Sequence, residues 1–307
     1  MNSTIDGYTT KVEMHSEGKA LLTAIIPLKA SWPDRANVMS WLLRENASSI
    51  HYVFVFDRPT PEIEEANRSV QSQFPNFQID IVEGQFFGPG SARNAGFVFI
   101  DTKYVAFWDS DDNPNLEEVL SILVREGEES EKVYVGAFGI EKAGQQIKRI
   151  HTLNLKQLAR NPGLWRCLIP SKLLVGCEFP SNLLGEDQVF LAKVLINASS
   201  IEFVNRHFYT YSYGNQGQLT SSRDLAPLEE SEKLLAAILH TGITNEISRF
   251  ILDLSSKQLL TLLRYGSVKQ KSFSLVRLSR RVLVHGREGI ASILSMLQVP
   301  IRERFNA

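Results

Sequence analysis

Between Ala20 and about Phe138, short runs of hydrophobic residues alternate with stretches in which hydrophobic residues recur every three or four positions. The runs predict buried strands, and the helical spacing predicts helices that pack against them. This alternation is typical of an α/β fold with a mostly parallel sheet and helices on both faces. The predicted strands are 21–26, 51–56, 77–82 and 104–108, and the predicted helices are 34–46, one from residue 60, and 91–100.

After this alternating part the pattern changes. Two further strands are predicted at 133–140 and 146–151, and a helix from about Gly185 to Ile196. From about residue 225 onward hydrophobic residues keep helical spacing throughout. We therefore expect a domain at 1–224, with halves at about 20–138 and 139–224, and a helical C-terminal region at 225–307.

Polar groups follow three of the predicted strands. Pro27, which we expect to end the first strand, is followed by Leu28-Lys29; Asp57 follows the second strand, and Asp109–Asp112 follow the fourth. Ligands bind beyond the carboxyl ends of the strands in sheets of this kind. We therefore expect these groups to lie near one another at one edge of the sheet.

The carboxylates of Asp109, Asp111 and Asp112 directly follow a hydrophobic strand. Like charges this close cost free energy unless a cation or solvent offsets them. Carboxylate oxygens suit Mg²⁺ or Mn²⁺, which they would share with the phosphates of a substrate. An acidic turn that caps the next helix is the alternative, because Asn113-Pro114 follow. The pattern alone leaves both interpretations open.

Four segments in order carry a family resemblance. They are Ile25-Ile26-Pro27, the run Gly88-Pro-Gly-Ser-Ala-Arg-Asn-Ala-Gly96, Phe107-Trp-Asp-Ser-Asp-Asp112, and Gly185-Glu186-Asp187. Together they resemble the family 2 inverting glycosyltransferases of bacterial polysaccharide biosynthesis, over about Ala20 to Ser222. The resemblance implies the GT-A fold, which is Rossmann-like, with a C-terminal helical appendage here.

The resemblance also implies roles for individual residues in binding a nucleotide-sugar, with a uridine diphosphate sugar expected. Asp57 would accept a hydrogen bond from the base, Arg93 would hold the base or the phosphates, and Asp109 would contact the ribose or the sugar. Asp111 would bind Mn²⁺ or Mg²⁺. The remaining expected donor contacts are Pro27 and Ser110.

Elementary chemistry supports two of these roles, since a divalent ion and a guanidinium both stabilise charge that builds on a diphosphate leaving group. A surface arginine and a strand-end turn residue are the alternatives for Arg93 and Asp57. The sequence departs from the family after Asp57, where Arg58-Pro59 replace a second acid and Gly-Ser. That departure leaves the identity of the base open.

An inverting transfer needs a base that takes the proton of the acceptor hydroxyl. By the resemblance, Asp187 would be that base and Glu186 would orient towards the acceptor or the donor sugar. The alternative is a pair of acids that favour the first turn of a helix. His207 is a further candidate metal ligand, with a structural histidine as its alternative. Trp165 and Arg166 are candidates for the acceptor pocket.

Composition narrows the class of protein. The chain has 307 residues and a formal net charge of −1, and so lacks the basic excess of proteins dedicated to duplex nucleic acid. The first residues lack the hydrophobic core of a secretory signal, and no hydrophobic run approaches the ~20 residues of a membrane span. We therefore expect a cytoplasmic protein in which Cys167 and Cys177 are buried free thiols, with a disulfide between them as the alternative.

The last forty residues are strongly basic. Leu275, Leu278, Val282, Ile290, Ile293 and Leu297 fall near one helical face, and only Glu288 and Glu303 oppose eight lysines and arginines between Val268 and Ala307. A basic amphipathic helix can lie on an anionic membrane surface, on the inner face of the cell membrane. Packing on the catalytic domain or on a second subunit of a homo-oligomer is the alternative.

The expected function is therefore the transfer of a sugar to a hydroxyl of a glycan or lipid-linked acceptor. A sugar-1-phosphate nucleotidyltransferase is the second enzyme class, although Pro27-Leu-Lys-Ala-Ser31 lacks its Gly-rich, Arg-containing loop. A catalytically silent glycan- or nucleotide-binding module is the third hypothesis. Fold alone does not separate these three, because function resides in the site.

Overall fold

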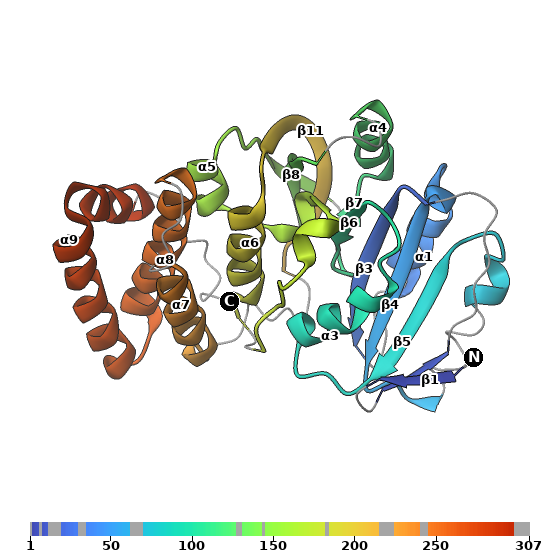
Figure 1. The fold of residues 1–307 in the computed structure, drawn as a ribbon, viewed down its shortest axis with the longest axis horizontal. Helices are drawn as coiled ribbons and strands as arrows, with labels where there is room; N and C mark the ends of the chain where they lie inside the picture. Colours follow the sequence, from blue (N-terminus) through green and yellow to red (C-terminus); the bar gives the residue numbers. More distant parts are fainter. Residues whose placement is uncertain are drawn as a thin grey trace. The chain divides into compact units, whose positions relative to one another are not determined.

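The computed structural model describes residues 2–5, 8–11, 20–29, 35–61, 70–126, 131–142, 145–181, 184–214, 224–239 and 245–297. The chain forms two compact units (Figure 1). The first, here called the sheet unit, contains 1–151, 165–178 and 198–215. The second, the helical unit, contains 152–164, 179–197 and 216–307.

The sheet unit is built on one mixed sheet. Its strands, in spatial order, are β1 (Asn2–Ile5), β2 (Tyr8–Lys11), β5 (Ile79–Gly84), β4 (Ile50–Asp57), β3 (Leu22–Lys29), β6 (Tyr104–Phe107), β10 (Cys167–Pro170), β8 (Val133–Lys142), β11 (Ile201–Ser212) and β7 (Asn113–Pro114), and β9 (Gln145–Ile150) pairs with β8. The strands β5, β4, β3 and β6 are mutually parallel, and so are β8 and β11. The predicted mostly parallel part is confirmed, and antiparallel β10 joins it to β8.

Helices cover both faces of the parallel strands. Alternate residues of β3 and β4, including Ile26 and Phe54, form one core with α1 (Arg35–Leu42) and α4 (Leu116–Glu126). The opposite face meets α3 (Pro89–Ala95) and the short helix η2 (Gly96–Phe99). A Cβ on Gly96 would lie 2.8 Å from the Ile25 side chain, so only glycine allows this approach. The α/β class with helices on both faces is confirmed.

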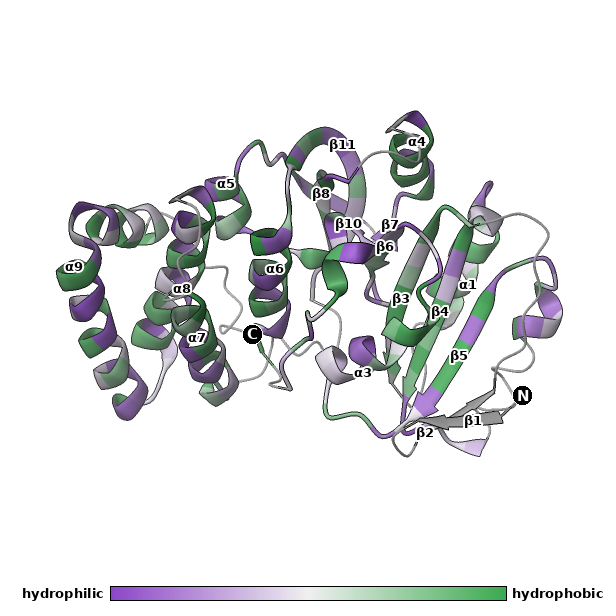
Figure 2. Cartoon of the chain, viewed as in Figure 1, coloured by the Kyte–Doolittle hydropathy of each residue, from purple (hydrophilic) through white to green (hydrophobic). Residues whose placement is uncertain are grey.

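Hydropathy follows this arrangement: the central strands are largely hydrophobic, whereas hydrophobic and hydrophilic residues alternate along the helices (Figure 2). The prediction that Pro27 ends the first strand is wrong, because β3 continues to Lys29. Pairing between β3 and β6 stops at Ile25, so Pro27 pairs with β4 on one side only. The missing backbone N–H of Pro27 therefore breaks no hydrogen bond to β6. Proline is tolerated at such one-sided positions. The helix predicted from Thr60 falls largely on 62–69, outside the described residues.

The helical unit is organised around one long helix, α8 (Asn245–Tyr265). It contacts α5 (Leu155–Arg160), α6 (Glu186–Asn197), α7 (Ala226–Ile238) and α9 (Val268–Leu297). The division into units therefore differs from a boundary near residue 224, because α5 and α6 pack with the C-terminal helices. Three short helices lie outside this packing: η1 (Ala47–Ser49) and η4 (Ser171–Leu174) belong to the sheet unit, and η3 (Leu164–Arg166) lies where the chain passes from one unit to the other.

Two expectations from composition can be compared with the structure. Cys167 and Cys177 are both buried free thiols, as predicted. Within the described ranges, no helix has the length and hydrophobicity that crossing a membrane requires.

Candidate functional site

The carboxyl ends of three parallel strands meet at one edge of the sheet. Asp57, the last residue of β4, lies opposite Lys29 of β3 and Gly84 of β5. Phe107, the last residue of β6, pairs with Ile25 on the other side of β3, and Asp109 follows two residues later. Pro27 lies between these points on β3, opposite Val55. The predicted grouping of Pro27, Asp57 and Asp109 at one sheet edge is what the register produces.

The Asp57 carboxylate is held by its surroundings. Its Oδ1 accepts a hydrogen bond of 2.7 Å from the Phe86 backbone N–H, and the Arg58 guanidinium lies 3.3 Å away. Arg58 has a φ of 55°, a left-handed conformation that turns the chain out of the strand. The Asp57 side chain is about a quarter exposed, so the carboxylate is fixed in place yet accessible to a ligand.

Arg93 and Asp109 form the central ion pair of this edge. Arg93 projects from α3, and its Nη2 donates a hydrogen bond of 2.6 Å to Oδ1 of Asp109. The Arg93 side chain is 7% exposed and the Asp109 side chain 32% exposed. The guanidinium is therefore ordered by a carboxylate that itself reaches the surface, and a surface role for Arg93 is wrong. Such pre-ordered guanidinium groups suit phosphate recognition.

A buried tyrosine holds the backbone of the same loop. The Tyr209 hydroxyl of β11 accepts a hydrogen bond of 3.0 Å from the Asp109 N–H. Burial, followed by the nearby carboxylates, raises the pKa of Tyr209 well above its usual value, so the hydroxyl stays protonated. The Tyr209 ring stacks on Trp165, with 4.5 Å between ring centroids and 18° between planes. Trp165 also stacks on Tyr211, at 6.0 Å.

The loop from Asp109 to Asp112 is tied to two further elements. Nδ2 of Asn37, on α1, donates to the carbonyl oxygens of Ser110 at 2.9 Å and Asp112 at 2.6 Å. The buried Asp112 carboxylate accepts a hydrogen bond of 2.7 Å from the Ser212 N–H. Burial, together with the charges of Asp109 and Asp111, raises the pKa of Asp112 well above its usual value. Asp112 therefore has a structural position, which the sequence did not separate from its neighbours.

The remaining carboxylate, Asp111, is half-buried. Among the described residues no three histidine, cysteine, aspartate or glutamate side chains are grouped as a metal site. The oxygen chemistry of Asp111 and Asp109 nevertheless suits Mg²⁺ or Mn²⁺, which proteins often bind through one or two carboxylates together with substrate phosphates. The residues present therefore fit a divalent ion whose coordination a substrate completes.

The surroundings of His207 match the structural alternative to a metal ligand. Its Nε2 lies 2.9 Å from the Thr210 hydroxyl on β11, and a Cβ on Gly139 would lie 2.9 Å from its ring. Burial, followed by the positive charge of Arg149, lowers the pKa of His207. These are the surroundings of a packed histidine in the sheet. We assign His207 this structural role and leave it out of the metal site.

The two candidate acceptor residues have different environments. Trp165 is half-buried and lies in the aromatic stack beside Tyr209. Arg166 is 1% exposed, and its guanidinium lies 4.7 Å from the centre of the Phe138 ring. Burial lowers the pKa of Arg166 to about 10. An acceptor contact by Arg166 is therefore wrong for this structure, since the side chain packs within the sheet unit.

Glu186 and Asp187 belong to the helical unit. They occupy the first turn of α6, where Glu186 is buried and Asp187 is half-buried. Oδ1 of Asp187 accepts a hydrogen bond of 2.9 Å from the Gln188 N–H. The turn before them depends on Gly185, whose φ is 81°. A Cβ on Gly185 would lie 2.9 Å from the Ser231 hydroxyl. The segment is thus held against α7, and both acids lie where the helix dipole favours negative charge.

Two contacts of the site, made by Asn37 and by the Tyr209 hydroxyl, were not identified from the sequence. Asn37 lies inside α1, where asparagine is a poor helix former, and that misfit was its only local signal. The Tyr209 hydroxyl reaches Asp109 across 100 positions of sequence. Hydrophobic spacing indicates that a tyrosine belongs to a strand, but it does not identify the partner of its hydroxyl.

The sequence of the chain is similar to those of known glycosyltransferases. Residues 23–177, just over half of the chain, match the family model described as glycosyl transferase family 2. The chain is 24% identical over 196 residues to a cholesterol galactosyltransferase of Borreliella burgdorferi. That match covers 55% of this chain and 54% of the relative, so the chain spans about half the length of the curated relative it matches.

Solved structures share the fold. TarS residues 1–349 from S. aureus superimposes with a TM-score of 0.63 at 16% identity, over 89% of this chain and 81% of that one. The same protein in complex with UDP-GlcNAc gives 0.64 at 16% identity, over 90% and 79%. The mannosyltransferase PcManGT from Pyrobaculum calidifontis, in complex with GDP-Man and Mn²⁺, gives 0.55 at 12% identity, over 92% and 88%.

Proposed function

Because the chain belongs to glycosyl transferase family 2, we propose that it transfers a sugar from a nucleoside-diphosphate sugar to a hydroxyl group of an acceptor. The observation that carries the proposal is the ion pair between Arg93 and Asp109 beside Asp111, at the carboxyl ends of the parallel strands. It places a guanidinium from α3, which can bind phosphates, beside the loop whose Asp111 carboxylate can bind a divalent ion.

The proposed donor is a uridine diphosphate sugar. Two relatives in fold are described with nucleoside-diphosphate sugars, UDP-GlcNAc for TarS and GDP-Man for PcManGT. In this chain Asp57 would accept a hydrogen bond from the base, Asp109 would contact the ribose or sugar, and Arg93 would contact the phosphates. Pro27 and Ser110 complete the proposed donor contacts. The ordered Asp57 carboxylate supports this assignment, since Phe86 fixes its orientation.

Asp111 is the proposed ligand of Mn²⁺ or Mg²⁺. Such an ion would neutralise the negative charge that grows on the diphosphate as it leaves. The Arg93 guanidinium would stabilise the same negative charge. Asn37 fixes the loop on which Asp111 lies. The half-exposed position of Asp111 supports this role better than the buried position of Asp112.

The proposed reaction is a direct displacement that inverts the anomeric carbon. The acceptor oxygen forms a bond to that carbon while the bond to the diphosphate oxygen breaks, and the nucleoside diphosphate leaves. Asp187 takes the proton of the acceptor hydroxyl, and Glu186 orients the acceptor or the donor sugar. The position of both acids in the first turn of α6 supports a carboxylate that is ionised and ready to accept a proton.

The proposed acceptor is a glycan or a lipid-linked glycan. Trp165 offers an aromatic face, which is a common surface against the apolar side of a sugar ring. Its stack with Tyr209 connects that face to the loop that carries Asp109. We also propose that the chain forms a homo-oligomer, although none of the reaction steps above requires a second subunit.

A panel of nucleotide-sugars incubated with Mn²⁺ tests the function. We expect slow release of nucleoside diphosphate from one donor, faster with acceptor, and none after chelation of the metal. Release of pyrophosphate from a nucleoside triphosphate and a sugar phosphate would instead identify a nucleotidyltransferase. Binding without any release would identify a silent module. Either of these results would contradict the proposal.

A further inference from the structure

The outward face of α9 exposes large hydrophobic side chains. Between its start and the kink at Gly286 (φ 51°), five such residues are exposed. Val268 and Leu283 are each 83% exposed, and Val276 is 68% exposed; Leu275 and Val284 are the other two. Scattered exposed apolar residues are ordinary, whereas five within nineteen positions of one helix mark a surface that contacts something apolar.

This set shares Leu275 with the apolar face predicted from the sequence. The predicted residues Leu275, Ile290 and Leu297 are exposed, whereas Leu278 is buried and Val282 and Ile293 are half-buried. Contact with α8 explains their burial, so that part of α9 packs inside the helical unit. The exposed residues form a second apolar set, which the packing of α9 on α8 leaves outside.

The same stretch of α9 is strongly basic. From Val268 to Gly286 it contains Lys269, Lys271, Arg277, Arg280 and Arg281 and no acidic residue. Lys269, Lys271 and Arg280 are exposed among the hydrophobic residues. Lysine and arginine side chains can extend their charged ends to a polar surface while the hydrophobic residues beside them enter an apolar layer.

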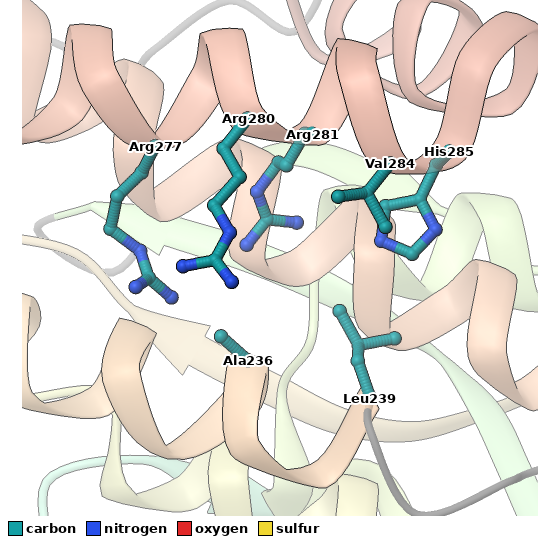
Figure 3. A pocket seen from close by; sticks show the side chains of 7 residues that line it. All are labelled: Ala236, Leu239, Arg277, Arg280, Arg281, Val284 and His285. Atoms are coloured by element: carbon teal, nitrogen blue, oxygen red, sulfur yellow. The ribbon is translucent and has the colours of Figure 1, made fainter.

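A small pocket concentrates this charge. It is lined by Arg277, Arg280, Arg281, Val284 and His285 of α9 and by Ala236 and Leu239 at the end of α7. Figure 3 shows the three guanidinium groups extending from α9 towards α7. The pocket volume is about 50 Å³.

One buried carboxylate only partly neutralises the pocket. Glu232 of α7 lies 2.7 Å from Nε of Arg277 and 2.7 Å from Nη2 of Arg281. Arg280 makes no ion pair with any residue in the described ranges. The other acids of that part of α7, Glu229 and Glu230, lie 3.1 Å and 3.8 Å from Lys233. Three guanidinium groups facing one carboxylate leave an excess of positive charge.

We propose that this face of α9 binds an anionic lipid surface, with a lipid phosphate at Arg280 and the exposed hydrophobic residues in the layer beneath the headgroups. The exposed hydrophobic residues and the basic residues of α9 both fit such a surface, because it offers apolar chains and phosphates side by side. The proposal goes beyond the transfer reaction and does not depend on it.

A second copy of this chain fits the face less well. In a symmetric dimer the same patch meets itself, so the basic residues of α9 would face those of the other copy. No acid lies between Val268 and Gly286 to offset that repulsion. An anionic lipid surface complements the charge and the hydrophobic residues at once.

Flotation of the full chain with lipid vesicles, without any nucleotide-sugar, tests the proposal. We expect binding to phosphatidylcholine vesicles that contain about a third phosphatidylglycerol, and none to pure phosphatidylcholine, at about 0.1 M salt. Val276 and Arg280 lie four residues apart on one face. The double variant Val276→Ser, Arg280→Gln should weaken binding about tenfold or more, since one basic residue near the surface contributes about fivefold.

A matched control is available in the sheet unit. Val124, which is also 68% exposed, and Arg125, which is exposed, lie on α4, and Val124→Ser with Arg125→Gln should keep full binding. All variants should unfold at the wild-type temperature, since the four residues are exposed. Equal binding to neutral vesicles, or unchanged binding by the α9 variant, would overturn the proposal. So would a dimer in sedimentation that only the α9 variant dissociates, without vesicle binding.

Discussion

A hydrogen bond of 2.6 Å joins Nη2 of Arg93 to Oδ1 of Asp109, two residues that lie 16 positions apart on α3 and after β6. The pair fixes a guanidinium before any ligand arrives, so little side-chain entropy remains to be lost on binding. It also offsets one of three neighbouring carboxylates. The ion pair therefore contributes both to the order of the loop and to the electrostatic potential that a diphosphate would meet.

Replacing Arg93 with glutamine should lower kcat/KM by about 100-fold, because a charge-stabilising group next to the leaving phosphate is lost. It should also lower the free energy of unfolding by about 2 kcal/mol, since Asp109 loses its buried partner. Steady-state kinetics and urea unfolding measure the two effects. Arg264→Gln is the control, since Arg264 is exposed on α8 of the helical unit and should change neither strongly. Unchanged affinity for the donor in Arg93→Gln would exclude the phosphate role.

Replacing Asp111 with asparagine should abolish the dependence on Mn²⁺, because the amide is a much weaker ligand for a hard cation. A titration of Mn²⁺ against nucleotide release should show no saturation in the variant. Asp224→Asn serves as the control, since Asp224 belongs to the helical unit, is exposed and accepts a hydrogen bond from the Ala226 N–H. Normal activation of Asp111→Asn by the metal would remove Asp111 from the proposed site.

Replacing Asp187 with asparagine should lower kcat by about 10²–10⁴-fold while donor affinity stays within error, because only the proton acceptor is lost. The amide oxygen can still accept from the Gln188 N–H, so the start of α6 should be preserved. Turnover and calorimetric binding of the donor separate the two quantities. Turnover like that of the wild type would rule out Asp187 as the base.

Replacing Tyr209 with phenylalanine should cost about 1–2 kcal/mol of stability, since the Asp109 N–H loses its buried acceptor. The donor KM should rise more than kcat falls, because the loop loosens while the groups on it remain. Tyr211→Phe is the control, as it also removes a hydroxyl from the aromatic stack with Trp165. Equal KM values in the two variants would show that the Tyr209 hydroxyl does not position the loop.

A buried histidine at the opposite end of β4 predicts a pH dependence of stability. Nε2 of His51 lies 2.7 Å from Asp80 and Nδ1 lies 2.8 Å from Asp101, with the side chain 1% exposed. Burial alone lowers the pKa of His51, but the hydrogen bonds and charges of Asp80 and Asp101 outweigh it. The net result raises the pKa above its usual 6.5.

Because the folded pKa of His51 exceeds the unfolded one, its stabilising contribution is complete below pH 6.5 and is lost as pH rises through the folded pKa. The free energy of unfolding, measured in urea at a series of pH values, should fall over that window. His51→Gln should lose this slope and about 1–3 kcal/mol at low pH. His151→Gln should keep the slope, because His151 is exposed and bonds to Asn205. A wild type without any slope would contradict the prediction.

Local patterns predicted the four parallel strands β3 to β6 and the antiparallel pair β8 and β9 well, but they did not predict β10. The strands β3, β4, β5 and β6 are hydrophobic runs that any register must bury. In contrast, β10 is four residues long and lies between two short helices, so no periodicity marks it. Its place in the sheet depends on partners more than thirty residues away, β6 and β8.

The candidate site shows the same division. Asp57, Arg93 and Asp109 could be found because their residue types stand at predictable strand ends and helix starts. The buried position of Arg166 and the contact of His207 with Thr210 could not, since both depend on how β8 and β11 pair. Short-range spacing therefore located polar residues at the strand ends, but it did not show which polar side chains the rest of the sheet would pack or bury.

The aspartate loop is less negatively charged than its sequence suggests. Arg93 compensates Asp109, and burial beside two carboxylates favours the neutral form of Asp112. Of three formal charges, the one on Asp111 dominates the field that an approaching ligand meets. A diphosphate would therefore meet weaker repulsion at this loop than three exposed carboxylates would exert.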